Sequence, residues 1–249
     1  MLERLRLGRL LDAGKRPMVR KTSKATALQP MWLDRCIWVD ETLCRTRQDQ
    51  SAQNNRIWVP KEVKKRPAAA GPLRDKLRTA TKQHNPGHMI AAGVYGSGKV
   101  FDRVAFIPLG VKINAPEHMR LMQEYYIQYA MDVAADGTGK PCFFFQDNAP
   151  SHTAKLCKEH YESMRKDLNV HVLALPPSSP DLTPLDYWAW NALKQAMPAD
   201  TPSLDARRVE IVSGWRKVVA NQDETKRAVD AWEKRLKKCL AADGDLFET

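Results

Sequence analysis

The chain lacks the features that mark secreted, membrane-embedded and disulfide-linked proteins. Its 249 residues include five cysteines, an odd number without the paired spacing of a metal site, so we expect reduced thiols and no zinc bound by them. No apolar run approaches the roughly 18 residues that a membrane span needs, and residues 1–6 do not begin a secretory signal. We therefore expect a reduced intracellular protein of one large domain, or one domain with an appendage.

Acidic residues are scarce relative to basic ones. The 40 Lys and Arg residues outnumber the 29 Asp and Glu residues, which gives a net charge of +11. The excess is concentrated in residues 1–30 and 56–82, and this predicts a nucleic-acid partner. The candidate phosphate-contacting residues are Lys61, Lys64, Lys65, Arg66, Arg74, Lys76 and Arg78. The run 64–66 suits either a basic loop on DNA or a nuclear import signal, and we expect a nuclear location.

Apolar periodicity predicts strands and helices that alternate along most of the chain. The expected strands are 35–44, 88–95, 100–109, 141–146 and 170–175, and the expected helices are 116–133, 151–166, 183–196, 203–220 and 223–241. This order predicts an α/β fold, with a ribonuclease-H-like mixed five-stranded sheet flanked by helices and followed by C-terminal helices. We divide the chain into a basic arm (1–30), a core (31–200) and a helical extension (201–249).

One glycine-rich segment nearly matches a phosphate-binding loop. Residues 93–100 fit the pattern G-x-x-x-x-G-K-[ST] except at Val100, where a hydroxyl should bind Mg²⁺. The residues that follow resemble a strand, whereas a phosphate loop needs a helix N-terminus there. We therefore interpret the segment as a hairpin turn and predict no nucleotide cofactor.

Three aspartates stand at the edges of apolar runs. Asp40 and Asp147 end predicted strands, and Asp186 lies in the first turn of the predicted helix 183–196. Converging carboxylates repel one another and persist with a cation between them. Two Mg²⁺ or Mn²⁺ ions about 4 Å apart are a common arrangement for cutting and rejoining phosphodiesters. We predict that the three aspartates are both the catalytic residues and the metal ligands.

The segments around these aspartates resemble the catalytic blocks of mariner-type transposases. Trp38-Val39-Asp40-Glu41 is similar to the first block, residues 146–153 (QDNAPSHT) to the second, and residues 178–187 (SSPDLTPLDY) to the third. The tail, with Trp232, Arg235, Cys239, Gly244, Phe247 and Glu248, is similar to the pattern that closes many members. The 38 residues between Asp147 and Asp186 exceed the common mariner spacing, which affects the sub-family more than the chemistry.

The resemblance implies a DDE/D transposase core that uses Mg²⁺ or Mn²⁺, cleaves DNA at transposon ends and transfers the strands to target DNA. It also implies a homodimer. Members usually carry about one hundred N-terminal residues with paired helix-turn-helix modules. Fewer than 40 residues precede Asp40, so we expect that region to be missing here. Two other interpretations stay open: a catalytically silent or domesticated DNA-binding remnant, and a ribonuclease-H-like nuclease acting on RNA–DNA hybrids.

Several neighbours of the aspartates need separate interpretation. Asp181 competes with Asp186, but the block places its carboxylate after the second proline, which favours Asp186. Glu41 should point to the opposite face of its strand from Asp40 and be solvated or ion-paired.

Two further residues are auxiliary candidates. His152 either contacts the scissile phosphate or the third carboxylate, or is structural. Asn148 either holds the turn by side-chain hydrogen bonds or contributes to catalysis. We interpret Trp188 and Trp190 as core residues.

Overall fold

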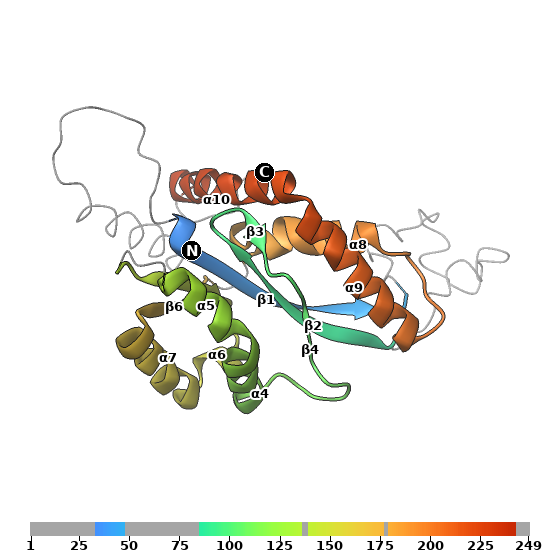
Figure 1. Cartoon of the computed structure of the whole chain (residues 1–249), viewed down its shortest axis with the longest axis horizontal. Helices are drawn as coiled ribbons and strands as arrows, with labels where there is room; N and C mark the ends of the chain where they lie inside the picture. The colour runs from blue at the N-terminus through green and yellow to red at the C-terminus, as the bar shows by residue number, and fades with distance from the viewer. Residues whose placement is uncertain (1–32, 48–84, 136–138, 177–178, 243–249) are drawn as a thin grey trace, which may run out of the picture.

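A mixed sheet lies at the centre of the computed structural model (Figure 1), which describes residues 33–47, 85–135, 139–176 and 179–242. Its strands are β1 (Cys36–Arg45), β2 (Gly87–Tyr95), β3 (Lys99–Val100), β4 (Ala105–Phe106), β5 (Cys142–Gln146) and β6 (Val170–Ala174). They lie in the order β3-β2-β1-β5-β6, and β4 also pairs with β2. β2 is antiparallel to β1, whereas β5 is parallel to both β1 and β6. The predicted mixed α/β arrangement is confirmed.

The second strand of the predicted hairpin is interrupted, so six strands form where five were expected. Four residues separate Val100 from Ala105, but only two separate their β2 partners, Val94 and Ala91. The extra residues bulge from the sheet, and the carbonyl of Phe101 accepts a hydrogen bond from Trp215 Nε1 at 2.8 Å. The glycine-rich segment is a turn between β2 and β3 with no helix after it, as predicted.

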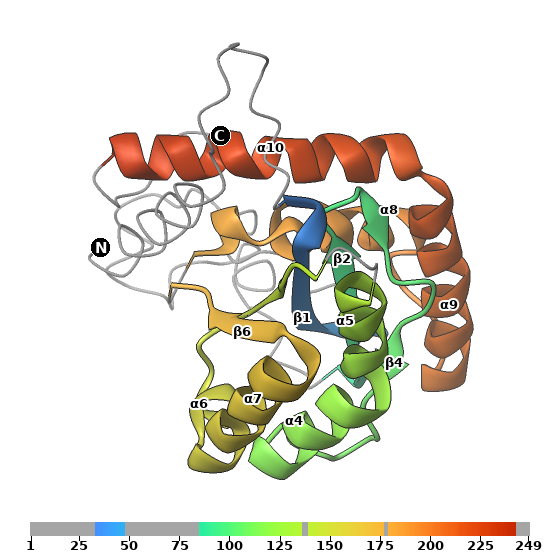
Figure 2. The same cartoon turned by 60° about the vertical axis from the view of Figure 1, so that its left-hand side comes forward.

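Helices cover both faces of the sheet (Figures 1 and 2). One layer contains α4 (Ala115–Leu121), the π-helical turn Met122–Tyr126, α5 (Ile127–Ala134), α6 (Pro150–Thr153) and α7 (Lys155–Leu168). The other contains α8 (Trp190–Ala196), α9 (Leu204–Ala220) and α10 (Gln222–Ala241). The short helical turns are Leu33–Arg35, Pro180–Leu182 and Leu185–Ala189. No helix in the described part is long and apolar enough to span a membrane, and the five cysteines are free and buried.

Alternating side chains of β1 enter two separate hydrophobic clusters. Trp38 packs against Phe145 and Trp232, with ring centroids 5.7 and 5.0 Å away. Ile37 and Val39 instead join the cluster under α4 and α5. Because strand side chains alternate with a period of two, the residues that follow, 40 and 41, are also directed to opposite faces.

The C-terminal helices share the core of the sheet. Trp232 of α10 is fully buried, and its Nε1 donates to the carbonyl of Leu182 at 2.8 Å, in the turn that precedes Asp186. This bond fixes the chain just ahead of the third aspartate. The division at residue 200 stays a prediction, and the arm 1–30 lies outside the described residues.

We expect Trp232→Ala to lower the free energy of unfolding in urea by about 3–5 kcal/mol, because it leaves a cavity between α10 and the sheet. Trp232→Phe keeps most of the ring and should cost about 1–3 kcal/mol through the unpaired Leu182 carbonyl. Val209→Ala, at a side chain that is 68% exposed, is the control and should change stability by less than about 0.5 kcal/mol. A Trp232→Ala variant as stable as the control would contradict this assignment of the core.

Candidate metal centre

The three predicted aspartates line one cleft. It has a volume of about 440 Å³ and lies where β1 and β5 meet the helical turn Leu185–Ala189. Its walls consist of Asp40, Glu41, Asp147, Asn148, Ala149, Leu175, Pro176, Ser179, Pro180, Thr183 and Asp186. Residues far apart in the sequence therefore place four carboxylates around one opening.

Asp40 is held by a tryptophan of the core. Trp190 Nε1 donates to Asp40 Oδ2 at 2.7 Å. Trp190 belongs to the core, as predicted, but its hydrogen bond to Asp40 was missed by the sequence analysis. The available signal was its spacing of four residues from Asp186, which places both side chains on one face of the helix.

Asp186 lies at the start of the helical segment, as predicted. The carbonyl of Thr183 accepts hydrogen bonds from the backbone N–H groups of Asp186 and Tyr187 at 3.0 and 3.1 Å. The backbone carbonyl of Thr183 thus caps the first turn of the helix. Asp181 does not line the cleft, and its carbonyl accepts a bond from Arg235 at 3.4 Å. The geometry favours Asp186 over Asp181.

Asp147 holds its own turn. Its Oδ1 accepts from the Ala149 backbone N–H at 3.1 Å and lies 2.6 Å from His152 Nδ1. The turn is thus held by Asp147 and not by the Asn148 side chain, which is exposed at the cleft. His152 contacts the second carboxylate rather than the third, and its ring is only 4% exposed.

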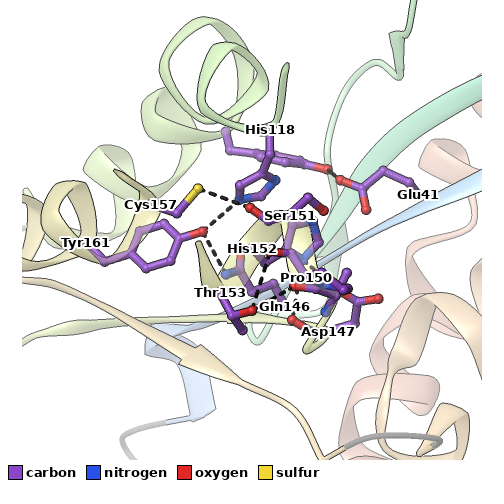
Figure 3. Close-up of polar contacts among 12 residues, drawn as sticks. Glu41, His118, Gln146, Asp147, Pro150, Ser151, His152, Thr153, Cys157 and Tyr161 are labelled. Carbon is purple, nitrogen blue, oxygen red and sulfur yellow. Dashed lines mark hydrogen bonds and ion pairs between the residues drawn. The ribbon is translucent and has the colours of Figure 1, made fainter. Parts of the chain in front are cut away.

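Glu41, predicted to be solvated or ion-paired, is directed inward toward His118 and His152. It points to the face opposite Asp40, as expected, and there its Oε1 accepts a hydrogen bond from Tyr126 at 2.9 Å (Figure 3). In the described part of the chain, one group of three side chains brings metal-ligand atoms within 4.8 Å of one another, and it is Glu41, His118 and His152. His118 carried no sequence signal.

Burial and mutual repulsion set the charge of the aspartates. Burial, followed by the charge of the nearby Asp186, raises the pKa of Asp40 to about 8, against the opposing effect of the Trp190 hydrogen bond. Burial also raises the pKa of Asp186. Burial acts to raise the pKa of Asp147 too, but the hydrogen bond and charge of His152 outweigh it and the pKa falls.

These shifts fit a divalent cation. Asp40, buried beside Asp186, retains a proton at neutral pH, and a cation can replace that proton. Carboxylate oxygens are the ligands that Mg²⁺ and Mn²⁺ prefer. The basic residues predicted to contact DNA, which lie between positions 61 and 78, fall outside the described residues.

We expect Asp40→Asn to raise the melting temperature of the metal-free protein at pH 8 more than at pH 5. A carboxyl whose pKa rises on folding stabilises the fold below its unfolded pKa, near 4, and loses that contribution as pH rises through about 8. The gain should be on the order of 1 kcal/mol, or about 2–4 °C. Differential scanning fluorimetry in EDTA measures it. Asp132→Asn, at an exposed site, should show no such difference, and an equal effect of Asp40→Asn at both pH values would refute the charge assignment.

Comparisons with known proteins agree with this geometry. The Mariner Mos1 transposase of Drosophila mauritiana is 34% identical over 106 residues, which are 42% of this chain and 29% of that protein. The chain thus spans less than a third of this curated relative. A Mos1 paired-end complex with the left transposon end has a TM-score of 0.63 at 20% identity, covering 99% of this chain and 63% of that one.

The Mos1 catalytic domain with Raltegravir and Mn has a TM-score of 0.62 at 20% identity and covers 99% of this chain and 96% of that one. At this identity the two structures establish the fold, which is the ribonuclease-H-like arrangement predicted. The family model for the DDE superfamily endonuclease matches residues 35–210, most of the chain. The protein therefore belongs to the DDE superfamily endonuclease family.

Proposed function

We propose that this chain is the catalytic domain of a transposase that cleaves DNA strands and transfers them to target DNA with two Mg²⁺ or Mn²⁺ ions. The observation that carries this proposal is the convergence of Asp40, Asp147 and Asp186 on one cleft. Family membership and the likeness to Mos1 structures with transposon ends and with Mn support it. When bound, such ions activate an attacking water or 3′-hydroxyl and stabilise the leaving oxygen.

The protein's part in this reaction is to aim carboxylate oxygens into the cleft. Asp40 Oδ2 accepts a hydrogen bond from Trp190. Asp147 Oδ1 accepts one from the Ala149 backbone N–H and lies beside His152 Nδ1. These hydrogen bonds orient the two carboxylates toward a metal ion. Asp186 is exposed in the first turn of its helical segment, where it can reach the same ions.

We also propose DNA as the partner and the nucleus as the location, with the basic residues between 61 and 78 contacting phosphates. Such contacts would make binding weaken steeply with salt. A homodimer is part of the same proposal. His152 acts here by orienting Asp147, and Asn148 is placed to approach the DNA at the rim of the cleft.

We expect Asp147→Asn and Asp186→Asn to lower Mg²⁺- or Mn²⁺-dependent plasmid nicking by more than about 100-fold, since even changes around metal ligands cost about 10- to 100-fold. Asp181→Asn is the matched control and should retain nicking. Gel quantification of nicked plasmid measures the series. No nicking by the wild type with either ion, or equal nicking by all four proteins, would refute the proposal, and preferential cleavage of an RNA–DNA hybrid would reassign the substrate.

Trp190→Phe tests how Asp40 is held. We expect it to raise the Mn²⁺ concentration for half-maximal nicking by about tenfold, because Asp40 loses the donor that orients it. Trp188→Phe is the control, since Trp188 packs against the same core cluster and lies in the helical turn directly before α8. If both variants need the same Mn²⁺ concentration, the Trp190 hydrogen bond has no role in metal binding.

A further inference from the structure

A second group of metal-ligand side chains lies beside the aspartate cleft, on the α4–α5 face of the sheet (Figure 3). Glu41, His118 and His152 each offer one ligand atom, and these atoms lie within 4.8 Å of one another. The two imidazole rings have centroids 3.9 Å apart and are tilted by 36°. One ligand atom from each ring is therefore close enough to share an ion with the other.

His118 has a nitrogen without a hydrogen bond, although its side chain is fully buried. The Tyr161 hydroxyl lies 2.8 Å from His118 Nε2. The other nitrogen, Nδ1, is enclosed and has no hydrogen-bond partner in the part of the chain that the structure describes. An unsatisfied buried polar atom costs about 1–3 kcal/mol. A cation bound at Nδ1 removes this cost.

His152 and Glu41 also each use one of their two possible ligand atoms in a polar contact with a neighbouring side chain. His152 Nδ1 lies 2.6 Å from Asp147 Oδ1, which leaves Nε2 as its second coordinating atom. Tyr126 donates to Glu41 Oε1, which leaves Oε2. Metal-bound histidines almost always donate their other N–H to a carboxylate or another acceptor, and bound carboxylates are hydrogen-bonded in turn. The group therefore has the outer hydrogen bonds of a metal site around all three ligands.

We propose that Glu41, His118 and His152 bind one transition-metal ion of the Zn²⁺ class. Two imidazoles and one carboxylate suit Zn²⁺ or Co²⁺, whereas Mg²⁺ prefers oxygen ligands alone. The site uses none of the three aspartates and does not depend on the proposed function. An ion on His152 Nε2 keeps the proton on Nδ1, so that His152 remains a donor to Asp147. This ion thereby positions a ligand of the neighbouring cleft.

The experiment is a Co²⁺ titration of the full chain, without a histidine tag, carrying Asp186→Asn and kept in excess Mg²⁺. Those conditions weaken and block the aspartate cleft. We expect visible Co²⁺ absorption that saturates at about one equivalent and is displaced by Zn²⁺. In this background His118→Gln and Glu41→Gln should each weaken Co²⁺ binding more than about 100-fold, and Tyr161→Phe about tenfold.

His171→Gln is the matched control, a partly buried histidine on β6 outside the group, and should bind Co²⁺ like its parent. Glu41→Gln keeps an acceptor for Tyr126, so one ligand variant retains its fold even if His118→Gln does not; melting curves check both. Co²⁺ binding that is absent, or that survives Glu41→Gln unchanged, overturns the proposal. Neither result affects plasmid nicking by the wild type with Mg²⁺ or Mn²⁺, which tests the proposed function separately.

Discussion

The alternation of side chains along β1 is the constraint on which the rest of the site depends. Asp40 follows Trp38 onto the face covered by α8, where Trp190 binds it. Glu41 follows Val39 onto the face covered by α5, where Tyr126 binds it. Two adjacent carboxylates thus serve different surroundings without competing for one ion. A shift of one residue in the pairing of β1 would exchange their places.

The second constraint is the cost of bringing carboxylates together. Burial and the nearby Asp186 raise the pKa of Asp40, and burial and Asp147 raise that of Asp186, so both carboxyls favour a proton or a cation. Neutral donors from the core, such as Trp190, orient the carboxylates without cancelling the negative charge. His152 orients Asp147 while staying buried itself, and its charge favours the ionised form of that carboxylate. Hydrogen bonds from the core therefore orient the carboxylates, and the negative charge of these carboxylates creates the affinity of the site for metal ions.

The features that depend on local sequence pattern were predicted from the sequence, whereas the features that depend on long-range contacts were missed. Asp40, Asp147 and Asp186 were found because each ends an apolar run within a recognisable block. The bulge after Val100 was missed because it accompanies a bond between Phe101 and Trp215, 114 residues apart. His118 was missed because no motif contains it, and its partners come from β1 and α6 through the fold alone. The surroundings of Glu41 were left open between solvent and an ion-pair partner, because periodicity gives the face of a strand but not what covers it.

The central claim is that Asp40, Asp147 and Asp186 together hold divalent ions in the cleft. Anomalous diffraction from crystals of this chain grown with Mn²⁺ tests it most directly. The account predicts anomalous peaks in direct contact with carboxylate oxygens of all three aspartates, with Trp190 still bound to Asp40. Peaks confined to other sites, with the three aspartates free of Mn²⁺ at saturating concentration, would contradict it.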